Sequence, residues 1–205
     1  MKQLRKYVGR LASVLFALQL LLFLVSWLLA AVSPGTSVRS LLAGEGVRWF
    51  FGRFVDNLAT PLLVWLLLAA LAYGALRSSG LLPTLRQLLS GPRLPFRSRY
   101  GLTIVLVEVI LVVVVMVLLT AIPHAVLLSA TGHLFPSSFS RSLVPVVCFA
   151  VILVSVSFGL ATGRFRSSDD VFNALSSGVA SWLPLWLLYV LAVQFYCSVC
   201  YVFFG

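Results

Sequence analysis

Charged residues are scarce in this sequence of 205 residues, because only 10% of them are Asp, Glu, Lys or Arg. Soluble domains carry about a quarter of such residues, whereas 61% of this chain is hydrophobic and its mean hydropathy is +1.09. This composition excludes an ordinary soluble domain and predicts an integral membrane protein. Acidic residues are the scarcest, five against fifteen basic ones. We expect the basic residues that give the net charge of +10 to lie near the lipid head groups and not to bind nucleic acid.

Motifs for catalysis are missing as well. The sequence contains no glycine-rich phosphate loop and no nucleophile followed by a base in a plausible order. The three cysteines lie in apolar segments and indicate no disulfide framework. The two histidines, His124 and His133, have no nearby carboxylate or cysteine to complete a metal site. We therefore expect no enzyme, no metal and no cofactor.

Five apolar segments are long enough for membrane-spanning helices, which need about 20 residues. The third is rich in β-branched residues, but a lone strand in lipid would leave its backbone groups unpaired, so we predict a helix there too. The expected fold is an all-α membrane protein that forms a single integral membrane domain over residues 1–205. The predicted spans are residues 11–32, 61–76, 101–122, 143–162 and 182–203.

Two other segments, residues 47–58 and 169–181, place an apolar face opposite a polar one, which predicts helices lying in the membrane interface. Ser167 and Asp170 have the spacing of a capping box before the second helix. Asp169 and Asp170 also suit the positive end of that helix. The order span, interfacial helix, proline, span occurs twice with opposite orientation, as in the inverted repeats of transporters. The alternative is a five-span protein with two interfacial helices and no repeat.

Basic residues predict the orientation, because Lys and Arg are enriched in cytoplasmic loops. Residues 77–100 contain five arginines and no acid, and we predict a cytoplasmic loop there. With the N-terminus inside, the inner segments carry eleven basic residues and the outer segments four. We therefore expect a multi-pass protein of the cytoplasmic (inner) membrane with its N-terminus inside. The arginines of the loop, which act as topology anchors, are Arg77, Arg86, Arg93, Arg97 and Arg99.

Glu108 lies inside the predicted third span, where a charge costs on the order of 2.5 to 3.5 kcal/mol on insertion scales. This cost makes Glu108 the leading candidate for a proton or cation site in transport. The alternative is a protonated glutamic acid that is hydrogen-bonded to Gln19 or Gln194 of another span. A snorkelling Arg97 or Arg99 would serve as a partner too. Gln194 is the second transport candidate, and its simpler role is that of an interspan hydrogen-bond donor worth about 0.6 kcal/mol.

The pair Cys197-x-x-Cys200 suggests a different chemistry, because two thiols on one helix face can exchange with disulfides. Redox motifs of this kind usually lie at the N-terminus of a helix in a soluble fold, and the sequence around Cys197 and Cys200 predicts neither feature. Small apolar residues that pack in the fifth span are therefore the simpler interpretation.

Three passages resemble the p-aminobenzoyl-glutamate transporter (AbgT) family, and they occur in the family's order. The family's opening region is similar to residues 40–58, SLLAGEGVRWFFGRFVDNL. The Ser-Gly-Leu after its next span is similar to residues 78–82, SSGLL. A later segment, with a basic loop, an interfacial helix and Ala-x-Gln-Phe, resembles residues 158–195, FGLATGRFRSSDDVFNALSSGVASWLPLWLLYVLAVQF.

The resemblance implies a shortened and divergent member of the family. Family members are longer, and the likeness fades after Leu82, where the family builds the first of two hairpins that form the substrate and ion path. Our first hypothesis is therefore transport of small molecules of the aminobenzoyl-glutamate type, within a homo-oligomer or with a second transporter subunit. The alternative is a structural or accessory membrane protein that retains only the scaffold half of a transporter and does not transport.

Overall fold

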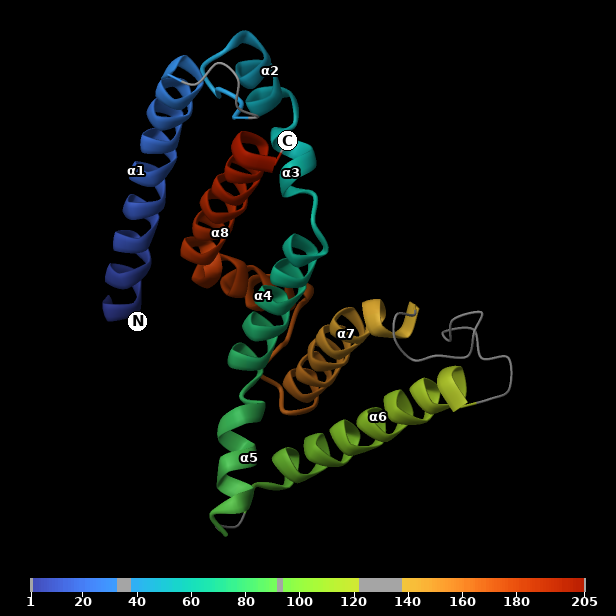
Figure 1. The fold of residues 1–205 in the computed structure, drawn as a ribbon. Helices are drawn as coiled ribbons and strands as arrows, with labels where there is room; N and C mark the ends of the chain where they lie inside the picture. The colour runs from blue at the N-terminus through green and yellow to red at the C-terminus, as the bar shows by residue number, and fades with distance from the viewer. Residues whose placement is uncertain (1, 33–37, 92–93, 122–137, 205) are drawn as a thin grey trace. The chain divides into compact units, whose positions relative to one another are not determined.

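The computed structural model describes residues 2–32, 38–91, 94–121 and 138–204, which form eight α-helices and no strand (Figure 1). Five of these helices, α1, α4, α6, α7 and α8, are long and apolar enough to span a membrane. The all-α membrane fold predicted from the sequence is therefore confirmed, while the interfacial helices and the inverted repeat stay predictions. The helices are α1 (Lys2–Val32), α2 (Gly44–Gly52), α3 (Phe54–Leu58), α4 (Pro61–Ser79), α5 (Leu81–Leu89), α6 (Phe96–Ala121), α7 (Ser138–Ala161) and α8 (Ser168–Phe204).

The chain divides into two compact units. Unit 1 comprises Met1–Val64 and Trp182–Gly205, and unit 2 comprises Trp65–Ser181. The division passes through α4 and through α8, so each of these helices contributes one part to each unit.

The core of unit 1 joins α1, the segment before α2 and the C-terminal turns of α8. Leu41 and Val202 are fully buried there. The backbone N–H of Arg39 donates to the Val202 carbonyl at 3.0 Å, which satisfies one of the carbonyls that a helix end leaves unpaired. The rings of Trp49 and Tyr201 stack with their centroids 4.3 Å apart. These contacts tie the end of α8 to the segment that leads into α2.

Unit 2 contains a close crossing of α4 and the first turns of α8. Each helix carries two small residues four positions apart, Ala70 and Gly74 on α4, and Ala174 and Gly178 on α8. A Cβ atom added to Gly178 would lie only 2.7 Å from the Cα of Gly74. Small residues at this spacing let two helix backbones approach each other in a membrane, so the pair of glycines sets the separation of the two helices.

The helices α6 and α7 form a hairpin in unit 2, in which they lie side by side (Figure 1). Phe158 and Val154 of α7 are buried against Leu81 of α5, and Leu102 and Val105 of α6 pack onto this cluster. The start of α6 therefore lies against the end of α7 and against α5.

The helix α5 lies where we expected only the loop of residues 77–100. Leu81, Leu85, Leu88 and Leu89 recur at the spacing of one helix face, and our interpretation weighed the arginines of this segment and overlooked that period. Gly80, with φ of 78°, separates α4 from α5, because glycine adopts a left-handed conformation at little cost.

Other helix bounds differ as well, since α1, α6 and α7 each begin before the span that we predicted within them. The helix predicted over residues 47–58 begins at Gly44 and is interrupted at Arg53, which gives α2 and α3. The segments predicted as residues 169–181 and 182–203 form one continuous helix, α8, which runs through Pro184. A proline inside a helix removes one hydrogen bond, and helices in apolar surroundings tolerate that loss.

We predict that Gly178→Ala lowers the melting temperature of the purified protein in detergent micelles by several degrees. The added methyl group would meet the backbone of α4, and overpacking of this kind costs about 1 to 3 kcal/mol. Gly9→Ala is the matched control, since an added Cβ there meets nothing within 4 Å, and alanine in a helix interior is favourable. Equal melting temperatures for the two variants would contradict the close crossing.

Candidate functional site

Buried polar side chains from three helices meet inside unit 1. Gln19 lies in the middle of α1, Gln194 and Ser198 lie one turn apart on α8, and Asn57 lies near the end of α3. Gln19, Gln194 and Ser198 are exposed by only 8%, 5% and 0%. Buried polar groups cost free energy unless they are hydrogen-bonded, so apolar packing does not explain why these side chains lie together. We call these four residues the polar cluster.

Hydrogen bonds connect the members of the polar cluster. The Nε2 of Gln19 donates to the Oγ of Ser198 at 3.1 Å, and that hydroxyl donates to the Gln194 carbonyl at 2.8 Å. The Nδ2 of Asn57 donates to the Oε1 of Gln194 at 3.4 Å. Gln194 is thus an acceptor toward α3, although we expected it to be a donor between spans.

Two polar atoms of the cluster have no hydrogen-bond partner among the described residues. They are the Oε1 of Gln19, which accepts, and the Nε2 of Gln194, which donates. Each is buried, and buried polar atoms in folded proteins normally have a partner. The cluster therefore retains one acceptor and one donor for a molecule that carries both kinds of group, such as an amide or a carboxylic acid.

A second set of contacts joins α8 to the junction of α3 and α4. The Tyr189 hydroxyl donates to the Leu58 carbonyl at 2.8 Å and lies 2.6 Å from the Oγ1 of Thr60. The Nε1 of Trp186, one turn earlier on α8, is buried and has no partner in the part of the chain that the structure describes. These contacts hold Asn57, which lies one residue before Leu58, in place beside α8.

Glu108 lies on α6 in unit 2, so it belongs to a different unit from the polar cluster. Its side chain is half-buried, and its Oε2 is shielded without a hydrogen-bond partner among the described residues. Val105, three residues earlier on the same helix face, packs against the buried cluster that includes α7. Glu108 therefore lies on the side of α6 that faces α7.

None of the partners that we considered, Gln19, Gln194, Arg97 and Arg99, bonds to the Oε2 of Glu108. Gln19 donates to Ser198, and Gln194 accepts from Asn57. Arg99 lies nine residues before Glu108 on α6, which corresponds to about 14 Å along the helix axis. Beyond Glu108, a gap of about 420 Å³ between α6 and α7 is lined by apolar side chains such as Val109, Val112 and Val151. Glu108 thus lies next to apolar surroundings.

The first turn of α8 carries the hydrogen bonds of a capping box. The Oδ2 of Asp170 accepts from the backbone N–H of Ser167 at 3.1 Å and from that of Arg166 at 2.8 Å. The N–H of Asp170 donates to the Oγ of Ser167 at 3.3 Å. The exposed Asp169 adds a second negative charge beside these N–H groups, which a helix N-terminus favours. These residues position the start of α8.

Arginines gather at one end of unit 2. Arg77 lies in the last turn of α4, Arg86 on α5, and Arg97 and Arg99 in the first turn of α6. The guanidinium of Arg164, in the turn between α7 and α8, donates to the Ser78 carbonyl at 3.4 Å. The two basic turns of unit 2 therefore lie at the same end. Arg93, His124 and His133 lie outside the described residues.

The cysteines of the fifth predicted span, Cys197 and Cys200, are free and half-buried. The structure thus places two thiols on α8 without a disulfide between them, and it adds nothing that favours redox chemistry over packing.

A transporter family model matches residues 86–202, which is more than half of the chain. The chain belongs to the AbgT transporter family. The match includes the passage at residues 158–195 that carried the resemblance, whereas residues 40–58 and 78–82 lie before it. It runs from α5 through α6 and α7 into α8, so our expectation that the likeness fades after Leu82 was wrong. No curated protein and no solved structure matches the chain significantly.

This AbgT protein is therefore a multi-pass membrane protein of a transporter family. Glu108, Gln194 and Ser198 lie within the matched region, and Gln19 and Asn57 lie outside it. Sequence reasoning missed Ser198 and Asn57 as members of the polar cluster. The spacing of Gln194 and Ser198 by four residues on one helix face was the only available signal for Ser198, and no local pattern pointed to Asn57.

We predict that the bond between Gln19 and Ser198 contributes about 0.6 kcal/mol, the typical value for interhelical hydrogen bonds in membranes. A double-mutant cycle with Gln19→Leu and Ser198→Ala, measured by unfolding in mixed micelles, should give this coupling. Ser13→Ala replaces Gln19→Leu in the control cycle, since the Ser13 hydroxyl bonds to Gly9 of its own helix. Coupling of the same size in both cycles would contradict the contact.

Proposed function

We propose that this AbgT protein takes part in the transport of small molecules of the aminobenzoyl-glutamate type. It acts in the cytoplasmic membrane, with its N-terminus inside, as part of a homo-oligomer or together with a second transporter subunit. The observation that carries the proposal is the family match over residues 86–202. That region contains both residues that the sequence suggested for transport, Glu108 and Gln194.

The polar cluster of unit 1 supports substrate binding. An aminobenzoyl-glutamate contains an amide group between its two halves. The free Oε1 of Gln19 is suited to accept from the amide N–H, and the free Nε2 of Gln194 is suited to donate to the amide carbonyl. Other copies of the chain, or a second subunit, supply the remaining walls of the path in this proposal.

Glu108 supports coupling to protons or cations. Its carboxyl group lies on a membrane-length helix beside apolar side chains, and the Oε2 is shielded without a partner among the described residues. Ionisable residues at such positions are costly and are typical of proton relays and ion pathways. Binding a proton or a cation would remove the cost of an unpaired charge there.

We predict that Gln194→Leu lowers uptake of radiolabelled p-aminobenzoyl-glutamate into proteoliposomes about tenfold, because one lost hydrogen bond to a buried group costs on the order of 1 to 3 kcal/mol. Gln87→Leu is the matched control, since Gln87 is exposed on α5, and its uptake should equal that of the unmodified protein. If the folded, unmodified protein shows no uptake in sodium or pH gradients, transport by a homo-oligomer fails, and either a second transporter subunit is required or the chain has a non-transporting accessory role.

We predict that Glu108→Gln abolishes the response of uptake to an imposed pH or sodium gradient, because glutamine has the shape of glutamic acid but cannot gain or lose a proton. Uptake should be measured at fixed substrate concentration while each gradient is imposed in turn. Unchanged gradient dependence in this variant would show that Glu108 is a packing residue.

A further inference from the structure

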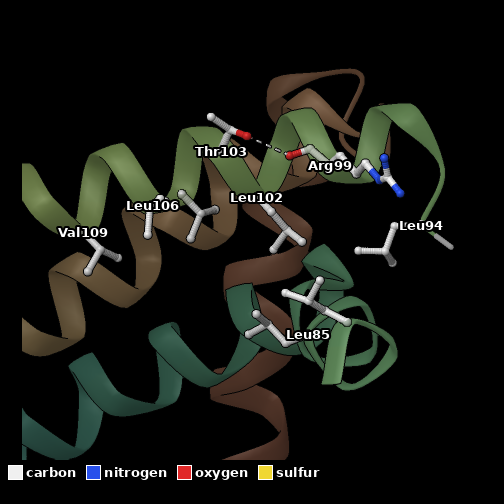
Figure 2. Close-up of a pocket in the computed structure, with 9 residues that line it drawn as sticks. Leu85, Leu94, Arg99, Leu102, Thr103, Leu106 and Val109 are labelled. Atoms are coloured by element: carbon white, nitrogen blue, oxygen red, sulfur yellow. Dashed lines mark hydrogen bonds between the residues drawn. The ribbon is translucent and has the colours of Figure 1, made fainter. Parts of the chain in front are cut away.

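A groove of about 580 Å³ lies between α5 and the first half of α6 in unit 2 (Figure 2). Leucines of α5 form one wall, and α6 forms the other. Leu94, which precedes α6, lines the same end of the groove as Arg99 (Figure 2). The groove is therefore lined by leucines and other apolar side chains, and Arg99 carries the one charge among the described residues that line it.

The wall that α6 contributes is polar at one end and apolar along its length. Arg99, Leu102, Leu106 and Val109 recur every three or four residues and so share one face of the helix. From Arg99 to Val109 this face extends about 15 Å, which is half of the roughly 30 Å hydrocarbon core of a bilayer. The groove thus has the length of one leaflet, with its charge at one end.

The hydroxyl group of Thr103 is already satisfied within α6. It donates to the Arg99 carbonyl at 3.1 Å, as the dashed line in Figure 2 shows. The wall beyond Arg99 therefore offers methyl and methylene groups to an occupant, and hydrogen-bond donors only at the guanidinium. A small free anion would find one contact there and would leave the apolar length of the groove unused.

The charge around the groove favours an anionic occupant. Residues 77–100 contain five arginines and no acid. The Arg99 side chain is exposed at the end of the groove, and a guanidinium can bind a phosphate through two parallel hydrogen bonds. Basic pockets between membrane helices bind the head groups of anionic lipids, and an acyl chain would use the leucine-lined length.

We propose that this groove binds an anionic phospholipid, with its phosphate at Arg99 and one acyl chain between α5 and α6. Neither Glu108 nor any member of the polar cluster is among the residues that line the groove, and lipid binding there does not depend on the proposed transport function. The lipid would hold α5 against α6 by filling the space between them.

Native mass spectrometry of the full chain tests this proposal. The protein is purified in micelles with equal amounts of dioleoyl phosphatidylglycerol and dioleoyl phosphatidylcholine, and the retained lipids are counted. We expect one retained phosphatidylglycerol. Arg99→Gln should lower its occupancy about fivefold, which corresponds to the roughly 1 kcal/mol that one arginine contributes near an anionic lipid surface. Arg99→Lys keeps the charge but loses the paired hydrogen bonds of the guanidinium, so its occupancy should lie between those of the unmodified protein and Arg99→Gln.

Two further variants separate the groove from general charge attraction. Arg86→Gln removes the same charge from the same basic segment, but Arg86 does not line the groove, so retention should be unchanged. Leu106→Trp fills the groove while every charge is kept, and retention should fall. Leu106 is 60% exposed, so the fold should tolerate the change.

Several results would overturn the proposal. Equal losses in Arg99→Gln and Arg86→Gln would indicate attraction to the basic surface alone. Equal retention of the two lipids would show that the head group is not recognised. A wild-type protein without retained lipid, whose dimer signal disappears in Leu106→Trp, would assign the groove to a second copy of the chain.

Discussion

Hydrocarbon offers no hydrogen-bond partner, so the polar groups that a chain carries into a membrane must be satisfied by the protein itself. In unit 1 this constraint acts most strongly where a helix begins or ends. The Leu41 N–H donates to the hydroxyl of Ser26 at 3.1 Å, and the Leu58 carbonyl at the end of α3 accepts from the hydroxyl of Tyr189. Side chains of the long helices thus satisfy backbone groups of α3 and of the segment that leads into α2, which helps to hold these parts against α1 and α8.

The same constraint separates structural polar groups from candidate functional ones. Ser26 and Tyr189 complete backbone bonds within the protein. Gln19, Gln194, Glu108, Ser155 and Trp186 each retain a buried polar atom that no described residue satisfies. A protein that carries such atoms pays for them in stability unless something else binds there, and a bound substrate, proton or cation would supply the missing partner. Of these five, Glu108 is the one with an ionisable side chain, and Gln19 and Gln194 belong to one hydrogen-bonded cluster, which is why our proposal assigns transport to these three residues.

The sequence predicts the long helices well because the thickness of the bilayer sets their length and their hydropathy. The capping box in the first turn of α8 could also be predicted from the sequence, because Ser167 and Asp170 lie only three residues apart. The polar cluster could not be predicted from the sequence, because Gln19 and Ser198 are 179 residues apart. Hydrophobic periodicity indicates only which residues of one helix share a face. The position of Glu108 was evident in the sequence, whereas its surroundings depend on how α6 packs against α7.

The arginines of residues 77–100 show why composition alone described this segment incompletely. Counted as charges, they predict which side of the membrane the segment lies on. Placed on helices, they differ: Arg77 donates to the Tyr73 hydroxyl within α4, Arg86 lies on the exposed side of α5, and Arg99 lies at the end of a leucine-lined groove. If these arginines only set the membrane topology, any one of them could replace another. Arg99 is distinct from Arg77 and Arg86 because it lines the groove between α5 and α6, where its charge adjoins an apolar surface about as long as one leaflet.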